Sequence, residues 1–386
     1  MSENMQKANE YVRQLRMQRE AYQDFADKRI IPLFQDNDQH LERRPPRHFV
    51  DSSFLYVRSF NGDDGNRPFS NQVYWLSPDI LISPVSNPGV YTRTLNAGEM
   101  YNLQCYVHNR GDMVAPSIKV EFWLTDPSLG FDTRYATHLT LGRVPTIWVN
   151  PYSSGVAQVT YTVPPTESGH KCLFARLFSF SPVDLPIDDF RLEPPLDRHI
   201  GQSNLHIVPQ AQPFMFNVIH PPNAELIIQF DSMGFEELLS LNYPVMGDVM
   251  PFRDIPTGGW TERTGVDLSD TDAQVIDFGR ENNQLFLATH DPEEIDWAAQ
   301  VEIRQMIKRV QAEIDAGLTR RADHRDLFAK YREINGRTRR STFKMHTPDI
   351  GLAPNQAIGL HIRSFDHGNP EEAEVLGGIT LLIVGE

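Results

Sequence analysis

The stretch Met100-Tyr-Asn-Leu-Gln-Cys-Tyr-Val-His-Asn109 decides the fold class of this chain. Tyr101, Leu103, Cys105 and Val107 occupy every second position, with Asn, Gln and Tyr between them. Successive side chains of a strand point to opposite faces of its sheet. The alternation therefore predicts a β-strand with one face in a hydrophobic core.

Similar short apolar runs recur on both sides of this stretch, separated by turn residues. They are Val73–Trp75, Ile80–Ile82, Ile118–Leu124, His138–Leu141, Thr146–Val149, Val156–Val163 and Lys171–Phe180. About seven short strands within about 110 residues, with no helical pattern between them, are typical of an antiparallel β-sandwich.

Short motifs within residues 72–210 point to a family. They are Trp75-Leu-Ser-Pro-Asp-Ile80, Tyr106-Val-His-Asn-Arg-Gly111, Ala115 and Val120-Glu-Phe-Trp123. Together they resemble bacterial immunoglobulin-like domains of the cell-adhesion-related (CARDB-like) type, over about a third of the chain. The resemblance implies an immunoglobulin-like sandwich that serves as a binding or spacer module, with no catalytic residues to carry over.

The two cysteines, Cys105 and Cys172, mimic the order of true immunoglobulin domains, with Trp123 between them. A disulfide requires both thiols to point inward. Cys105 shares a face with the apolar residues of its strand, but Cys172 lies opposite the aliphatic series at positions 173, 175 and 177. We therefore expect two free thiols.

Residues 211–386 form a second predicted unit. Its strand-like runs are Phe214–Ile219, Leu226–Asp231, Gln284–Ala288, Ser341–His346, Ala357–Arg363 and Gly377–Val384, the last with the composition of a strand buried on both faces. A short helix is expected over Phe235–Leu241, and residues 245–273 are rich in loop-forming residues. Asp291-Pro-Glu-Glu294 predicts a helix start with an Asp cap and Pro in the first turn, running to about Ala316. A second helix is expected over Asp323–Ile334.

These segments predict a mainly β protein with two immunoglobulin-like antiparallel β-sandwich domains. The expected organisation is an N-terminal helix (residues 3–28) and linker within residues 1–49, a first sandwich over residues 50–210, and a second sandwich over residues 211–386. The second sandwich carries a helical-hairpin insertion over residues 291–336.

Composition and charge exclude several classes of protein. The chain has 386 residues and a net charge of −15, which argues against general binding to nucleic acids or anionic membranes. Residues 51–290 hold 14 basic and 27 acidic side chains, so the negative charge is concentrated there. No apolar run approaches the roughly 20 residues that span a bilayer. The first residues lack the apolar core of a secretory signal, so we expect a cytoplasmic protein or export by a route independent of signal peptides.

Common catalytic signatures, such as GxSxG, HExxH and GxGxxG, are missing. We therefore predict no catalytic, cofactor-binding or metal-ligating residues and no cofactor. Asp197, Arg198 and His199 could be read as an acid–base cluster. Because adjacent residues cannot all face one centre, we interpret them as an Asp–Arg pair bracing an inter-domain segment, Asp184–Gln202.

Other candidates have simpler interpretations. The stretch Asn61–Asn66 is interpreted as a turn and not as a calcium loop, because its Gly positions are wrong for an EF-hand. Asp267, Asp270 and Asp272 could bind a cation, but we expect a solvated loop. The basic run Arg337–Arg340 is expected to meet an acidic surface of this or another subunit. His170 with His199, and His361 with His367, could meet in space.

Aromatic residues around the first sandwich could form a sugar-binding platform, although core packing explains the inward ones. They are Tyr74, Trp75, Tyr91, Tyr101, Phe122, Trp123, Phe131, Trp148 and Tyr152. The favoured function is that of a non-enzymatic structural or protein-interaction protein, a component of a bacterial multi-protein assembly, with protein partners or self-assembly. Two alternatives stay open: a carbohydrate-binding module, and an effector or toxin exported without a signal peptide. An enzyme with an unrecognised site also stays open.

Overall fold

The computed structural model describes most of the chain after residue 51. The described ranges are 52–69, 72–92, 94–165, 169–181, 184–240, 250–252, 254–316, 318–366 and 375–385. The predicted N-terminal helix and its linker lie outside the described residues. Across the described ranges the protein is mainly β, with several antiparallel sheets, which confirms the predicted fold class at this level.

The first two sheets form what we call the N-terminal sheet pair. In the outer sheet, β4 (Met100–Asn109) pairs on one edge with β9 (Ser153–Thr162) and on the other with β2 (Ile80–Pro84) and β1 (Leu55–Tyr56). In the inner sheet the order is β12 (Ile200–Ser203), β11 (Cys172–Phe178) and β5 (Ala115–Thr125), with β7 (Thr137–His138) and β8 (Thr146–Val149) beyond β5. Strands β3 (Thr94–Leu95) and β10 (Gly169–His170) form a separate two-stranded sheet.

The alternation predicted for residues 101–107 is confirmed. Tyr101, Leu103, Cys105 and Val107 are buried between the two sheets, together with the aliphatic side chains of β11. Cys172 lies on the opposite face of the inner sheet, in a separate apolar cluster. Both cysteines are free and buried, and the inner sheet separates them.

The remaining sheets form the C-terminal sheet pair. The larger sheet has the order β13 (Leu205–Pro209), β22 (Val375–Val384), β21 (Gln356–Asp366), β15 (Ala224–Ser232), β19 (Gln284–Thr289) and β18 (Val275–Glu281), with β16 (Met250–Pro251) also beside β21. The smaller sheet has the order β17 (Asp267–Thr271), β20 (Arg339–His346), β14 (Pro213–His220) and β6 (Ser128–Leu129). Two short helices, α3 (Phe235–Ser240) and α4 (Trp260–Thr264), connect strands. The expected loop at Asp267–Asp272 is wrong, because β17 pairs with β20 there.

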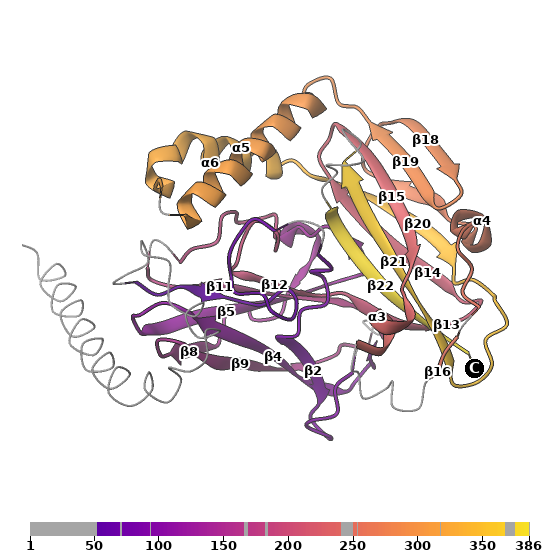
Figure 1. The fold of residues 1–386 in the computed structure, drawn as a ribbon, viewed down its shortest axis with the longest axis horizontal. Helices are drawn as coiled ribbons and strands as arrows, with labels where there is room; N and C mark the ends of the chain where they lie inside the picture. Colours follow the sequence, from indigo (N-terminus) through magenta and orange to yellow (C-terminus); the bar gives the residue numbers. More distant parts are fainter. Residues whose placement is uncertain are drawn as a thin grey trace, which may run out of the picture.

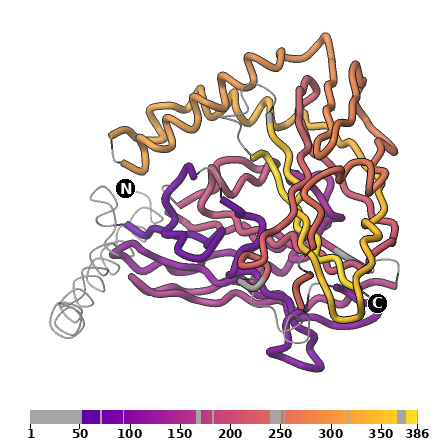
Figure 2. The backbone as a smooth tube through the Cα atoms, turned by 45° about the vertical axis from the view of Figure 1, so that its right-hand side comes forward, coloured from indigo at the N-terminus to yellow at the C-terminus, as the bar shows by residue number. Residues whose placement is uncertain are grey.

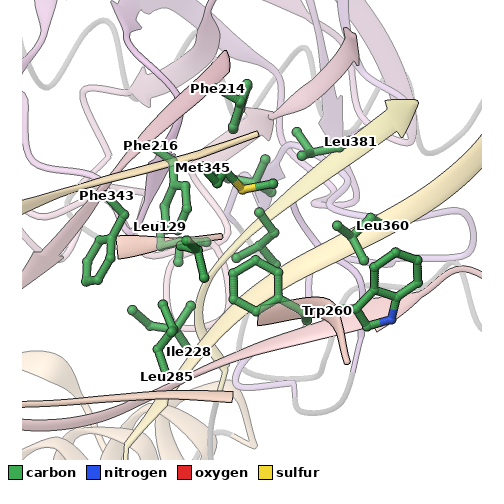
Figure 3. Packing of buried hydrophobic residues seen from close by; sticks show 14 of the residues in the cluster. Leu129, Phe214, Phe216, Ile228, Trp260, Leu285, Phe343, Met345, Leu360 and Leu381 are labelled. Atoms are coloured by element: carbon green, nitrogen blue, oxygen red, sulfur yellow. The ribbon is translucent and has the colours of Figure 1, made fainter. Parts of the chain in front are cut away.

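A single apolar cluster fills the space between these two sheets. Figure 3 shows Phe216, Phe343 and Met345 of the smaller sheet near Ile228, Leu285 and Leu381 of the larger one. Leu129 of β6 belongs to the same cluster and is fully buried. Strand β22 is buried along almost its whole length, as predicted from its apolar composition.

The helical hairpin lies between β19 and β20, where an insertion was predicted. It consists of α5 (Trp297–Asp315), the 3₁₀ turn η6 (Arg321–His324) and α6 (Arg325–Asn335). The predicted cap at Asp291 is wrong: the cap is Asp296, whose carboxylate accepts a hydrogen bond from the amide of Ala299 at 2.7 Å. Asn223 explains the difference, because its side chain accepts from the Asp291 amide and donates to the Ile295 carbonyl, which holds these residues in a turn.

The N-terminal part of the chain contributes one strand to the C-terminal sheet pair. Strand β6 follows β5 in the N-terminal pair but pairs with β14 of the C-terminal pair, and the chain changes from the inner sheet to the larger C-terminal sheet at Asn204. The predicted boundary at residue 210 stays a prediction. Figure 1 shows the strands of the two pairs at a steep angle to each other, and in Figures 1 and 2 the hairpin lies over the N-terminal pair.

Candidate functional site

A buried network of charged side chains lies where the hairpin meets the N-terminal sheet pair. Its centre is residues 184–199, which we call the junction segment. Pro186, Pro194 and Pro195 supply no backbone donor, so the segment does not form a sheet ladder. Its apolar side chains pack under the hairpin, in a cluster of Ile187, Leu196, Ile303, Ile307, Val310, Phe328 and Tyr331.

Arg198 connects three parts of the network. Its Nη2 lies 3.1 Å from Oδ1 of Asp184, and its Nη1 lies 3.5 Å from Oδ1 of Asp315 at the end of α5. Its Nε donates to the backbone carbonyl of Leu55 in β1 at 3.2 Å. The guanidinium also lies over the ring of Phe54. One cation therefore joins the outer sheet, the junction segment and the hairpin.

His199 lies between two carboxylates. Its Nδ1 is 2.7 Å from Oδ1 of Asp197, and its Nε2 is 3.5 Å from Oδ1 of Asp184. Burial alone would raise the pKa of Asp197, but the charge and hydrogen bonds of His199, with the amide of Ile187, lower that pKa to about 2. Burial also opposes ionisation of Asp184, yet His199 and Arg198 hold its pKa below the usual value. Both acids are therefore carboxylates at neutral pH.

Glu193 is the second buried acid of the junction segment. Its Oε2 accepts hydrogen bonds from Arg304 of α5 and from the hydroxyl of Tyr331 of α6, each at 2.6 Å. Arg191 lies 3.0 Å from its other oxygen. Burial opposes its ionisation, but the two arginines keep the pKa of Glu193 below the usual value. Glu193 thus fixes both hairpin helices to the junction segment.

The turn at residues 61–66 belongs to the same network. Asp63 accepts hydrogen bonds from the amides of Ser59 and Gly65 and pairs with both terminal nitrogens of Arg67. Arg67 in turn donates to the carbonyl of Pro194 at 2.7 Å, and its backbone amide donates to Asp315. Backbone N–H groups and a guanidinium therefore donate hydrogen bonds to both oxygens of the Asp63 carboxylate. This is the pattern expected for a turn and not for a calcium loop.

A second seam joins the segment after β6 to the end of the hairpin. Arg134 donates to Asp132 through Nε at 2.9 Å and to the backbone carbonyl of Asn335 through Nη2 at 3.0 Å. The hydroxyl of Thr338 donates to Asp132 at 2.5 Å. Asp132 is buried, and its charge is fully paired within the chain.

The network has the residue types of a catalytic site but not its access. Asp184, Asp197, Arg198 and His199 are each no more than 6% exposed, so a substrate atom cannot come within hydrogen-bond reach of them without a rearrangement. The hydroxyl of Ser53 donates to Asp184. Among the residues that the structure describes, no group of three or more His, Cys, Asp or Glu has the geometry of a metal site. The arrangement holds segments together.

The predicted pair between Asp197 and Arg198 is wrong, because each residue pairs with a different partner. Asp197 pairs with His199, whereas Arg198 pairs with Asp184 and Asp315. Adjacent side chains point in different directions, so the two ionic contacts diverge. These contacts join β1, the junction segment and the hairpin, whereas the inter-domain position of the segment stays a prediction.

The other charged candidates lie away from the network. Asp267 and Asp270 lie in β17, and Asp272 accepts from the amide of Arg340 and from the hydroxyl of Tyr135. The basic run meets acidic residues of this same chain, as predicted: Arg337 contacts Glu294 at 2.6 Å, and Arg339 contacts Asp291 at 3.4 Å.

The aromatic candidates do not share one surface. Tyr74, Trp75, Tyr101, Phe122 and Phe131 are buried, whereas Trp148 and Tyr152 are exposed by 52% and 41%. Trp123 stacks on His138 with ring centroids 4.1 Å apart.

Neither predicted histidine pair has both of its side chains among the described residues. The side chain of His170 and the whole of His367 lie outside the described parts of the chain. His199 contacts the two carboxylates above, and His361 contacts Thr380 and Glu237.

Asn204 is a buried polar residue that the sequence does not single out, as are Asp184 and Glu193 of the network. Its Nδ2 donates to the carbonyls of Ser128 and Gly378, and its Oδ1 accepts from Cys172 and lies 2.8 Å from Nε2 of His206. Trp75 packs beside it, directly over Gly378, where a Cβ would lie 2.2 Å from the indole. The flanking segments Ile200–Ser203 and Leu205–Pro209, both strands in the structure, carry no pattern that predicts the role of Asn204.

Comparisons with known proteins give no family. No family model and no curated protein matches the chain. Among solved structures, it is similar to the collagen adhesin from S. aureus, at 8% identity and a TM-score of 0.19, covering 80% of this chain and 92% of that one. The collagen-binding domain of Erysipelothrix rhusiopathiae surface protein RspB gives 7% and 0.17, covering 83% and 99%. The CupB6 tip adhesin from Pseudomonas aeruginosa gives 6% and 0.15, covering 80% and 97%. TM-scores this low do not establish a shared fold.

None of the helices that the structure describes combines the length and the apolar character needed to cross a bilayer.

Proposed function

We propose that this chain is a non-enzymatic structural or protein-interaction protein and a component of a multi-protein assembly. The observation that carries the proposal is that the junction network joins separate segments of the chain. Its reactive side chains are buried and paired with one another, across β1, the junction segment and the hairpin. A network of this kind supports a rigid body that presents fixed surfaces to a partner.

Strand β6 and the crossing at Asn204 support the same proposal. Relative motion of two domains is the default when few contacts join them. Here a strand of one sheet pair completes a sheet of the other, and buried hydrogen bonds surround the crossing. A rigid body suits a scaffold better than a hinged enzyme.

The domain organisation is part of the same proposal. We propose that the two sheet pairs are two immunoglobulin-like domains, the first of the CARDB-like type, with the boundary between Asn204, where the chain enters the larger C-terminal sheet, and residue 210. The hairpin is then a clamp from the second domain onto the first.

The proposal is tested on the full chain by native mass spectrometry, light scattering and pull-down against candidate proteins encoded beside it. We expect either self-assembly or a stable complex. As a matched control, His199→Gln should leave complex formation unchanged in the folded protein, because His199 contributes stability and no chemistry. A strict monomer at high concentration, with no bound protein, contradicts the proposal. Binding on a glycan array in that same preparation would favour a carbohydrate-binding module instead.

A further inference from the structure

The outer sheet has an open edge along β9. This ten-residue strand pairs with β4 over its whole length, and the structure pairs no second strand with it among the described residues. In an antiparallel pair, every other residue directs its N–H and C=O groups away from the partner strand. A row of such unpaired groups is a template for a further strand.

Strand β9 lacks the usual protection of an edge. Natural edge strands carry charges, prolines or bulges, or are very short. The sequence Ser-Ser-Gly-Val-Ala-Gln-Val-Thr-Tyr-Thr has no charge and no proline, and its register with β4 has no shift. In contrast, the edge strands β17 and β18 of the C-terminal pair both carry charged residues and a register shift.

The absence of charge extends across the outer sheet. None of its strands, β1, β2, β4 and β9, contains Asp, Glu, Lys or Arg. Its open face carries amides instead: Gln104 donates to Gln158 at 2.7 Å, and Gln158 donates to Asn102 at 3.2 Å. Two copies of a chain with a net charge of −15 repel each other. The outer sheet is a surface on which they can approach without a direct like-charge contact.

We propose that β9 pairs antiparallel with β9 of a second copy across a two-fold axis, so that two outer sheets become one. This inference rests on the proposed function, because it names the surface used for assembly. The exposed positions of β9 are Ser154, Val156, Gln158, Thr160 and Thr162. Gln158 is their centre, and an axis there places Val156 opposite Thr160 of the second copy. A two-fold interface must be self-complementary, and this register contains no pair of like charges.

Apolar side chains at the two ends of the edge fit the same arrangement. At one end, Tyr152 is 41% exposed, and Trp148 of the adjoining strand β8 is 52% exposed. At the other end, Met100, which pairs with Thr162, is 50% exposed. Because the copies run antiparallel, the aromatic end of one copy faces the Thr162 end of the other, where Met100 lies one strand back from the edge.

Cysteine cross-linking tests the register. Gln158→Cys places two thiols opposite each other, at a Cα separation of about 5.5 Å, which a disulfide can span. We expect a covalent dimer under mild oxidation. Thr162→Cys alone should stay uncross-linked, because its two copies lie about 26 Å apart in this register. Ser154→Cys combined with Thr162→Cys should cross-link again. The native thiols are buried, and burial raises the pKa of both Cys105 and Cys172, so they do not compete.

Light scattering over a concentration series tests the interface itself. We expect the wild-type chain to dimerise, and Gln158→Lys to weaken the dimer at least about tenfold, because two lysines then face each other on the axis. The matched control is Ile276→Lys on the charged edge strand β18, where the side chain is 61% exposed. This control should leave the dimer unchanged.

Three results would overturn the inference: a monomeric wild-type chain, a dimer that Gln158→Lys does not weaken, or a dimer that Gln158→Cys does not cross-link. If a monomer still binds another protein, the proposed function stands and only the second-copy inference fails. If Gln158→Lys abolishes that binding, the edge serves a different protein. A monomer without any partner refutes both proposals.

Discussion

The two outer faces of the N-terminal sheet pair differ in their charged side chains. The far face of the inner sheet packs against the junction segment through Leu192, which clusters with Cys172 and Phe174. The charged residues of that segment, Arg198, Asp184 and Glu193, are buried and paired. Along β4 and β9, the described side chains on the far face of the outer sheet are at least partly exposed. The four strands of this sheet have no Asp, Glu, Lys or Arg. This chain buries charged side chains where the facing residues belong to the same chain. An internal partner has a fixed geometry, so the cost of removing charges from water can be offset reliably.

The largest expected effect comes from removing the central cation. Arg198→Ala leaves Asp184 and Asp315 buried without their guanidinium, which should lower the free energy of unfolding by about 3–5 kcal/mol. Chemical denaturation measures this loss. Arg337→Ala is the control, because its ion pairs are exposed and should contribute little. Equal effects of the two changes would show that the junction network is no stronger than a surface pair.

A slightly smaller loss is expected from Leu129→Ala in β6. Leu129 comes from the N-terminal part of the chain but is buried in the C-terminal core, so truncation leaves a cavity that costs about 2–5 kcal/mol. Unfolding curves from two probes should shift together, because one strand serves both sheet pairs. Leu141→Ala, at an 80% exposed position, should change little. Two separate transitions in the wild-type protein would contradict this coupling.

Acid should weaken the junction network through Asp197. The pKa of Asp197 is about 2 in the folded protein, against 3.8 for the free group. Because the folded pKa is lowered, the stabilisation is complete above pH 4 and is lost as the pH falls toward 2, with a total of about 2 kcal/mol. Asp197→Asn should flatten the fall in unfolding free energy over this range. An unchanged pH profile in the variant would show that His199 does not stabilise the carboxylate.

The smallest effect is expected from adding a charge to the exposed side of β9. Thr160→Lys adds one charge to the exposed side of β9 and should change the free energy of unfolding by no more than about 0.5 kcal/mol at monomer concentrations. Thermal unfolding of dilute protein measures it. A large loss there would mean that the open edge already contacts another part of the chain.

The sequence predicts what local patterns control. The alternation at residues 101–107 gives the strand, its buried face and the position of Cys105, because one strand against one core determines them. The same reasoning places Cys172 on the other face of its strand.

Features that depend on distant contacts escape prediction. The helix start at Asp296 depends on Asn223, more than seventy residues earlier. The pairing of β6 with β14 and the partners of Arg198 depend on how two sheet pairs meet, and no periodicity within a segment encodes that. Of the candidate site, the sequence therefore predicts the bracing role of residues 197–199 but not their partners.

The strand order of the larger C-terminal sheet has a consequence for biosynthesis. Strand β22, at residues 375–384, lies between β13 and β21, and it is the parallel neighbour of β13 at residues 205–209. The described strands of the N-terminal sheet pair all lie before residue 204, so they are synthesised long before β22. The edge of β13 must wait for β22, and an unpaired apolar edge invites aggregation. The interval between translation of these two strands is therefore when the apolar edge of β13 is exposed to wrong pairing.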